Sequence, residues 1–184
     1  MSANWLGIPP GGNHFAGGLV VQTYSGLFWF ARLLAEHPVT SVLEIGSCSG
    51  FLAVLFALQC PGQTVTIDVA PLAMGEKQAD LYRRLGITFV CGDALQPDMA
   101  VRLMGAQARP RFVFCDNGNK LDEFRLYAPL LDHGDIIAVH DNPTEFPADG
   151  DEVTDLAHRH NLRRWRRDEL DADGTLLAIW QKST

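Results

Sequence analysis

The sequence predicts a doubly wound α/β protein, with a mostly parallel seven-stranded sheet, helices on both faces and an antiparallel edge strand. Three observations lead to this fold class. Short apolar runs alternate along the chain with longer segments of helical periodicity. The runs are apolar on both faces, which is typical of strands covered by helices on each side. The last two runs are joined by a polar stretch that contains glycine, as in a hairpin.

The N-terminal part of the chain is predicted to form an arm and a helix. Residues 1–18 are rich in Gly, Pro and Asn, which favours irregular structure. From Leu19 to Glu36 apolar residues recur at helical spacing, which predicts an amphipathic helix before the first strand. We expect a single domain over residues 1–184. Residues 1–36 would form an arm and a helix over the functional site, and residues 38–184 would form the core.

The strand segments are short and rich in β-branched and aromatic residues, whereas the segments between them have helical spacing and length. The predicted strands are Ser41–Ile45, Thr64–Asp68, Thr88–Cys91, Arg111–Cys115, Asp135–His140, Leu162–Arg166 and Thr175–Gln181. The predicted helices of the core are Gly50–Gln59, Lys77–Leu85, Pro97–Gly105, Leu121–Leu131 and Asp151–His160. The stretch Asp168–Gly174 joins the last two strands as a hairpin.

Composition narrows the class of protein. The formal charge of −7 disfavours binding to nucleic acid or to an acidic membrane, because either needs an electropositive face. The four cysteines have no CxxC spacing, which favours reduced thiols over a zinc site. The N-terminus lacks a signal peptide and no apolar run is long enough to span a bilayer. We expect a cytoplasmic protein.

The stretch Val42–Gly50 carries most of the functional information. An apolar strand leads into Glu44, Gly46 and Gly50, and an apolar helical run follows. This spacing lets the backbone of a strand-to-helix turn approach a ligand, while a helix N-terminus faces the same ligand. The stretch therefore predicts a nucleotide-type binding turn.

Carboxylates recur where the predicted strands end, and in a doubly wound sheet ligands bind beyond those ends. These residues are Glu44, Asp68, Asp93, Asp116 and Asp141. Asp68 lies 22 residues after Gly46, where a carboxylate can accept both hydroxyl hydrogens of a ribose. Asp93 either accepts from the amine of an adenine or caps the following helix.

Two ligands compete for the glycine turn. A dinucleotide needs the spacing Gly-x-Gly-x-x-Gly to cradle a pyrophosphate, whereas Gly46 and Gly50 are separated by three residues. A negative Glu44 would repel a pyrophosphate but would suit an ammonium group. S-adenosylmethionine offers an ammonium, a carboxylate, a ribose and an adenine, and the sequence favours it.

The ordered motifs resemble those of class I S-adenosylmethionine-dependent methyltransferases, over roughly residues 38 to 142. They are Val42–Gly50, Thr66-Ile67-Asp68 and Cys91-Gly92-Asp93-Ala94. The resemblance implies a Rossmann-like core and the cofactor-binding residues Glu44, Gly46, Ser47, Gly50, Asp68, Val69, Asp93, Ala94 and Asp116. Glu44 and the glycines would line the methionine end, Asp68 the ribose, and Asp93 with Ala94 the adenine. Leu52 departs from the catechol-type enzymes, which have a hydroxyl there.

A second group of polar residues follows the fourth and fifth predicted strands. Asp116, Asp141 and Asn142 offer two carboxylates and an amide oxygen, which are the ligands that Mg²⁺ prefers. Adjacent side chains of a strand point to opposite faces, so Asp141 and Asn142 converge only where the strand breaks. Pro143 supplies such a break. Without a metal, Asp116 would be a turn residue and Asp141 a solvated strand end.

This second group resembles the metal-dependent O-methyltransferases related to catechol O-methyltransferase. The stretch Asp116–Lys120 and the segment Trp5–Pro9 also resemble the branch named for macrocin O-methyltransferase and cephalosporin hydroxylase. In that branch the pair after the fifth strand is often two acids, and Asn142 departs from it. No set of two histidines and one carboxylate for iron is evident.

The mechanism implied is methyl transfer to a hydroxyl whose proton is removed. Lys120 is the candidate base, if burial and the metal lower its pKa, and Asp116 is the second candidate catalytic residue. In catechol-type enzymes the lysine follows the aspartate by three residues, the place of Asn119 here. We expect His140 to be a core histidine, with His14 of the arm as a lesser catalytic candidate.

The leading hypothesis is therefore an S-adenosylmethionine-dependent, Mg²⁺-assisted O-methyltransferase acting on a small hydroxylated molecule, either a sugar or a phenolic natural product. One alternative is a catalytically silent S-adenosylmethionine-binding partner or regulatory protein. Another is an NAD-dependent oxidoreductase, which the glycine spacing disfavours. A homodimer is also considered, because the aromatic segment Phe28–Phe30 would pack either a core or a dimer face.

Overall fold

The computed structural model describes residues 13–15, 18–20, 22–60 and 63–184. The segment Trp5–Pro9, on which part of the resemblance depends, lies outside the described residues, as does most of the predicted arm. In the part of the chain that the structure describes, no helix is long and apolar enough to cross a membrane.

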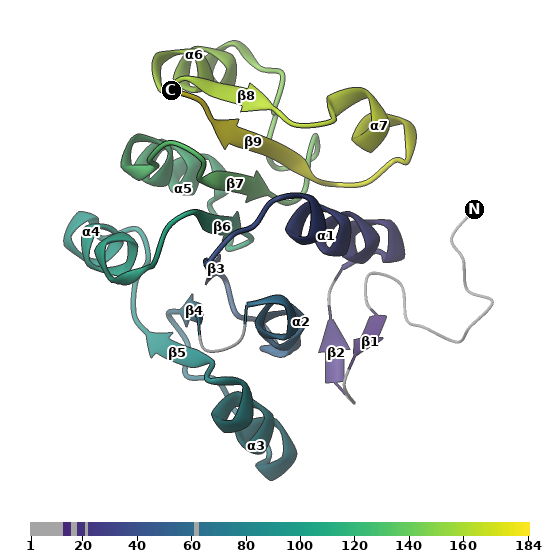
Figure 1. The fold of residues 1–184 in the computed structure, drawn as a ribbon, viewed down its shortest axis with the longest axis vertical. Helices are drawn as coiled ribbons and strands as arrows, with labels where there is room; N and C mark the ends of the chain where they lie inside the picture. Colours follow the sequence, from purple (N-terminus) through teal and green to yellow (C-terminus); the bar gives the residue numbers. More distant parts are fainter. Residues whose placement is uncertain (1–12, 16–17, 21, 61–62) are drawn as a thin grey trace.

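Seven strands form one sheet in the order β5-β4-β3-β6-β7-β9-β8 (Figure 1). They are β3 (Ser41–Ile45), β4 (Thr64–Asp68), β5 (Thr88–Cys91), β6 (Arg111–Cys115), β7 (Ile136–Val139), β8 (Leu162–Arg164) and β9 (Ala178–Lys182). The order reverses between β3 and β6, which is the switch point where such sheets bind ligands. Every pairing is parallel except those of β9, which is antiparallel to both β7 and β8. The predicted mostly parallel sheet is confirmed, and its antiparallel strand lies one place in from the edge strand β8.

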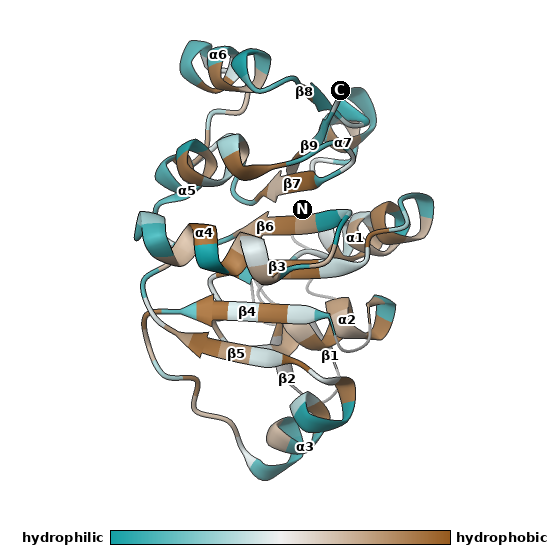
Figure 2. Ribbon diagram, turned by 60° about the vertical axis from the view of Figure 1, so that its left-hand side comes forward, coloured by the Kyte–Doolittle hydropathy of each residue, from teal (hydrophilic) through white to brown (hydrophobic). Residues whose placement is uncertain are grey.

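Helices cover both faces of the sheet (Figures 1 and 2). One face carries α4 (Pro97–Ala106), α5 (Lys120–Tyr127) and α6 (Asp151–Arg159). The other face carries α1 (Tyr24–Glu36), α2 (Phe51–Gln59) and α7 (Arg167–Ala172), and α3 (Glu76–Leu85) packs beside α2. We call the second of these the α1/α2 face.

Side chains of the central strands alternate between the two faces. On β6, Phe112 and Phe114 pack with α1 and α2, whereas Val113 and Cys115 pack with α4 and α5. On β7, Ala138 packs on the same face as Phe112 and Phe114. Because the alternation has period two, the even-numbered residues that follow these strands start out toward the α1/α2 face. This parity decides which polar side chains can meet beyond the strand ends.

Three segments differ from the sequence expectation. The first helix begins at Tyr24 and not at Leu19, because the hydroxyl of Thr23 accepts from the Gly26 amide at 3.0 Å and caps it. Before it, β1 (Asn13–Phe15) and β2 (Gly18–Val20) form an antiparallel pair in place of an irregular arm. The predicted hairpin connection contains the short helix α7.

The aromatic segment of α1 divides between core and surface. Trp29 and Phe30 are buried in the core of the α1/α2 face, which is the first of the two expected roles. Phe28 is exposed, as is Tyr24 one turn earlier.

Candidate functional site

The site lies at the carboxyl edge of the sheet, where β3, β4, β6 and β7 end side by side. Beyond the strands the hydrogen-bonded ladder continues for one residue. Gly46 N donates to Ile67 O, Asp116 N to Ile45 O, and His140 N to Cys115 O. Gly46, Asp116 and His140, which follow β3, β6 and β7, are therefore each held against a neighbouring strand by a backbone hydrogen bond.

Gly46 is required by close backbone packing. Its φ is +97°, a conformation that L side chains rarely adopt, and a Cβ there would lie 2.6 Å from the carbonyl oxygen of Asp116 and 2.8 Å from the amide of Asn117. Gly50 has φ +76°, and its carbonyl accepts from the Tyr82 hydroxyl at 2.8 Å. The glycines thus let the turn pack against the 116–117 loop on one side and α3 on the other.

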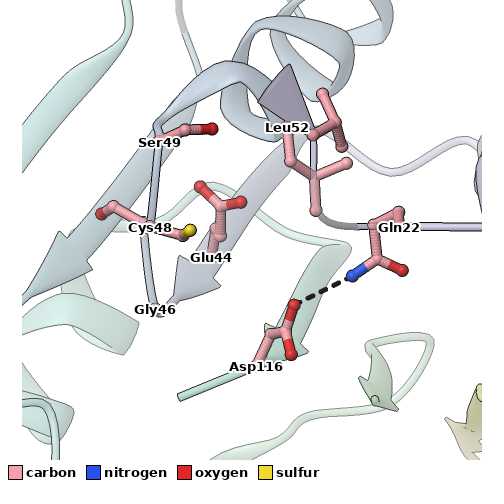
Figure 3. Close-up of a pocket in the computed structure, with 9 residues that line it drawn as sticks. Gln22, Glu44, Gly46, Cys48, Ser49, Leu52 and Asp116 are labelled. Atoms are coloured by element: carbon pink, nitrogen blue, oxygen red, sulfur yellow. Dashed lines mark hydrogen bonds between the residues drawn. The ribbon is translucent and has the colours of Figure 1, made fainter. Parts of the chain in front are cut away.

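A pocket of about 250 Å³, part of it open to solvent, lies between this turn and the β6 end (Figure 3). Its lining residues come from β2, the α1 entry, β3, the glycine turn, α2 and the β6 end: Val20, Gln22, Glu44, Gly46, Ser47, Cys48, Ser49, Leu52 and Asp116. Its lining is mostly polar or glycine, which suits the polar end of a small ligand.

Glu44 is a buried carboxyl among the residues that line this pocket. The residue is 1% exposed, and its Oε2 is buried without a hydrogen-bond partner among the described residues. Burial raises the pKa of Glu44 to about 8; the hydrogen bond with Thr66 opposes the rise, and the charges of Asp116 and Asp68 add to it. A cationic donor in the pocket would satisfy the oxygen and favour the ionised form.

The raised pKa of Glu44 predicts a pH-dependent stability. The folded protein holds this proton up to about pH 8, whereas the unfolded chain releases it near 4.5, so stability falls as the pH rises between these values. Glu44→Gln removes the titration. We expect the variant to gain stability relative to the wild type by up to about 1.4 kcal/mol per pH unit from pH 5 to 8, measured by urea unfolding. The control Glu76→Gln, at an exposed position, should show no such trend; a flat difference for Glu44→Gln would contradict the buried, protonated carboxyl.

Asp68 organises the glycine turn. Its Oδ2 accepts from the amides of Ser47 at 3.0 Å and Cys48 at 3.3 Å, and its Oδ1 accepts from the Ala70 amide at 3.1 Å. The Ser47 hydroxyl shares a 2.6 Å hydrogen bond with Thr66. A carboxylate can accept about four hydrogen bonds, so Asp68 keeps capacity for a further donor beside the pocket.

The residues predicted for an adenine lie at the end of β5 and beside it. Asp93 accepts from the Leu95 amide and the Gln96 side chain, and these bonds lower its pKa. It does not cap α4, whose N-cap is Gln96. Ala94 is buried, and Val69, after β4, is 59% exposed and available to a flat apolar ligand.

Asp116, His140 and Asp141 form a compact group beside the pocket. One ligand-type atom from each lies within 4.8 Å of the others. His140 Nδ1 is 3.0 Å from Asp116 Oδ1 and 3.3 Å from Asp141 Oδ1. Burial raises the pKa of Asp116, against the opposing effect of the His140 hydrogen bond. On its other oxygen, Asp116 accepts from Gln22 Nε2 at 2.9 Å (Figure 3).

The side chain of Asn142, the predicted third metal ligand, is hydrogen-bonded to the backbone. Its Oδ1 accepts from the Ala148 amide at 3.3 Å, inside the loop that follows β7. Asp141 has φ +60°, which turns the chain directly after the strand, and its Oδ1 lies 3.3 Å from His140 Nδ1. His140 is buried, as expected of a core histidine, but it belongs to the site.

Lys120 does not have the lowered pKa that its proposed role as a base requires. Its Nζ lies 2.8 Å from Asp141 Oδ2 and 2.9 Å from Glu145 Oε2. Burial disfavours the ammonium form, but the hydrogen bonds to the two carboxylates outweigh it and raise the pKa of Lys120. Lys120 is an ion-paired cation that holds Asp141.

This ion pair predicts how substitutions at Lys120 behave. Lys120→Arg keeps a cation beside Asp141, so we expect a methyl-transfer rate within about tenfold of the wild type. Lys120→Met should lower it further, because Asp141 and Glu145 lose their partner. Loss of a general base would instead lower the rate by about 10²–10⁴-fold in both variants. Equal, large losses in single-turnover assays would restore Lys120 as the base.

Sequence reasoning missed Gln22, Glu145 and the role of His140. Neither Gln22 nor Glu145 belongs to a sequence motif that indicates a functional residue. His140 has a signal in the strand parity: Glu44, Asp116 and His140 follow Val42, Phe114 and Ala138, which all pack on the α1/α2 face. The side chain of His14, the lesser catalytic candidate, lies outside the described part of the chain.

No protein-family model and no curated protein matches the chain. Solved structures do match. CmcI in a ligand-free form is 14% identical, with a TM-score of 0.74 over 100% of this chain and 84% of that chain. CmcI with Mg and S-adenosylmethionine is 15% identical, with a TM-score of 0.68 over 100% and 85%.

A third structure is the MycE methyltransferase from the mycinamycin biosynthetic pathway, in complex with Mg, S-adenosylhomocysteine and mycinamycin VI. It is 15% identical, with a TM-score of 0.57 over 87% of this chain and 50% of that chain. At these identities the likeness concerns the fold, and the strand order agrees with it. The chain therefore has the Rossmann-like fold of the class I S-adenosylmethionine-dependent methyltransferases.

Proposed function

We propose that this chain is an S-adenosylmethionine-dependent, metal-assisted O-methyltransferase that acts on a hydroxyl of a small molecule, such as a sugar or a phenolic natural product. The single observation that carries the proposal is the double position of Asp116. It lines the same pocket as Glu44, and it also belongs to the group with His140 and Asp141. A cofactor site and a metal-type donor group thus meet at one residue.

The polar groups that line the pocket suit the amino-acid end of S-adenosylmethionine. The unpartnered buried oxygen of Glu44 suits an ammonium donor, which would favour the ionised form. The three-residue gap between Gly46 and Gly50 argues against NAD. The spare accepting capacity of Asp68 suits a ribose hydroxyl, and the exposed Val69, with Asp93 and Ala94 beyond it, suits the adenine. When bound, the cofactor supplies a methyl group on a sulfonium centre.

The donor group fits a divalent cation. Asp116 and Asp141 offer carboxylate oxygens, as expected for Mg²⁺, and His140 adds an imidazole nitrogen to the predicted set. A cation held there lowers the pKa of an acceptor hydroxyl. Asp116, His140 and Asp141 would hold the cation and so orient the hydroxyl, whose proton would pass to solvent.

The segment before α1 is proposed to cover the site. Gln22 lies between β2 and α1, is 3% exposed and bonds to Asp116, which supports the assignment of residues 1–36 to a cover over a core of residues 38–184. Homodimer formation stays a proposal, for which the exposed Phe28 and Tyr24 offer an apolar face.

The proposal is tested by methyl transfer from labelled S-adenosylmethionine to a panel of sugars and phenols. We expect S-adenosylhomocysteine to form with at least one acceptor, to stop forming on chelation, and to form again when a divalent metal is restored. Binding of the cofactor without turnover on any acceptor would favour the catalytically silent partner. Turnover that survives chelation would remove the metal from the proposal.

A further inference from the structure

The donor group of Asp116, His140 and Asp141 has the spacing of three ligands on one face of an ion. Ligands about 2.1 Å from a common ion lie about 3.0 Å apart at right angles and about 3.4 Å apart at tetrahedral angles. His140 Nδ1 lies 3.0 Å and 3.3 Å from the nearer oxygens of the two aspartates. The distances also suit hydrogen bonds, so in the Nδ1-protonated tautomer the proton would occupy the place that an ion would take.

A second observation concerns the outer oxygens of the two carboxylates. Asp116 Oδ2 accepts from Gln22 Nε2, and Asp141 Oδ2 pairs with Lys120 Nζ. Each carboxylate is thus held by one oxygen, while its other oxygen, Oδ1, faces His140. Outer partners that fix one oxygen and direct the other inward are the usual support of metal ligands.

The chemistry of the third donor decides which ion the group prefers. Mg²⁺ favours oxygen ligands, whereas an imidazole suits the later first-row metals, whose affinity for a mixed nitrogen and oxygen set rises along the series. The oxygen that would complete an all-oxygen set, Asn142 Oδ1, is held by the Ala148 amide. The side chains of Asp116, His140 and Asp141 are 19%, 10% and 24% exposed, so the site is open enough for exchange but largely shielded.

We propose that Asp116, His140 and Asp141 bind a first-row transition-metal ion, from Mn²⁺ to Zn²⁺, in preference to Mg²⁺, and that His140 is the ligand that sets this preference. The role of the ion in methyl transfer rests on the proposed function. The preference itself is a binding property and needs neither cofactor nor acceptor.

Calorimetric titration of the metal-free protein with Co²⁺ and with Mg²⁺ tests the preference. We expect Co²⁺ to bind at least about tenfold more tightly. In His140→Glu, which supplies a carboxylate in place of the imidazole, the ratio should fall toward one. The control His133→Glu makes the same change at an exposed position and should keep the wild-type ratio. Equal affinities in the wild type, or a ratio that His140→Glu leaves unchanged, would overturn the proposal.

A spectroscopic measurement tests the ligand without any variant. Mn²⁺ bound to the wild type should show electron spin-echo modulation from a directly coordinated ¹⁴N. Its absence would overturn the role of His140 even if His140→Glu fails to fold. A protein that meets both expectations but transfers no methyl group loses the proposed function and keeps this site. One that transfers methyl groups while binding Mg²⁺ as tightly as Co²⁺ loses only the metal preference.

Discussion

Asp116→Asn is expected to lower the rate of methyl transfer by about 10²–10³-fold while changing the affinity for S-adenosylhomocysteine less than about threefold. The substitution removes the negative charge that the donor group needs. It conserves the shape of the side chain, and the close packing of the Asp116 backbone on Gly46 is untouched. The loss should therefore fall mainly on turnover, and the affinity should change little because the side chain keeps its place in the lining of the pocket.

The measurement compares single-turnover rates and calorimetric affinities in the wild type and the variant. Asp122→Asn is a matched control, because Asp122 lies six residues later in α5 and its side chain is 44% exposed. We expect both of its values to stay near those of the wild type. A rate for Asp116→Asn within about threefold of the wild type would mean that the donor group takes no part in the reaction.

Gly46→Ala is expected to destabilise the protein by about 2–4 kcal/mol and to abolish cofactor binding. One part of the cost is the positive φ of +97°, which an L side chain tolerates poorly. The other part is the clash of the new Cβ with the carbonyl carbon and oxygen of Asp116 and the amide of Asn117. These are backbone atoms, so relief requires the 116–117 loop to move away from the pocket.

Urea unfolding and calorimetry with S-adenosylhomocysteine check this prediction. Gly118→Ala is the matched control in the same loop, since no atom lies within 4 Å of its added Cβ. Its free energy of unfolding should change by less than about 0.5 kcal/mol. If Gly46→Ala binds the cofactor normally, the turn is not held by this close approach.

The sheet and its ligand edge could be predicted from the sequence because both depend on local pattern. Strands such as Phe112–Phe114 are apolar on both faces, and the carboxylates that follow them must gather at one edge of a parallel sheet. The glycine turn carries its own signature, although the structure adds that Gly46 is required by the neighbouring loop.

The group of Asp116, His140 and Asp141 could be predicted only in part. The backbone conformation just after a strand decides which side chains meet there. The left-handed φ of Asp141 brings its side chain back to His140, and the Ala148 amide engages Asn142. Neither contact follows from period-two alternation. The raised pKa of Lys120 likewise comes from the hydrogen bonds to Asp141 and to Glu145, which is 25 residues away.

The central claim is that the buried carboxyl of Glu44 receives the amino group of S-adenosylmethionine, and calorimetric titration with S-adenosylhomocysteine tests it most directly. The wild type should bind one equivalent, and Glu44→Gln should bind at least about tenfold more weakly, because a charge-assisted hydrogen bond is lost. NAD should not bind to either protein. Equal affinity of the two proteins for S-adenosylhomocysteine, or binding of NAD in its place, would contradict the account.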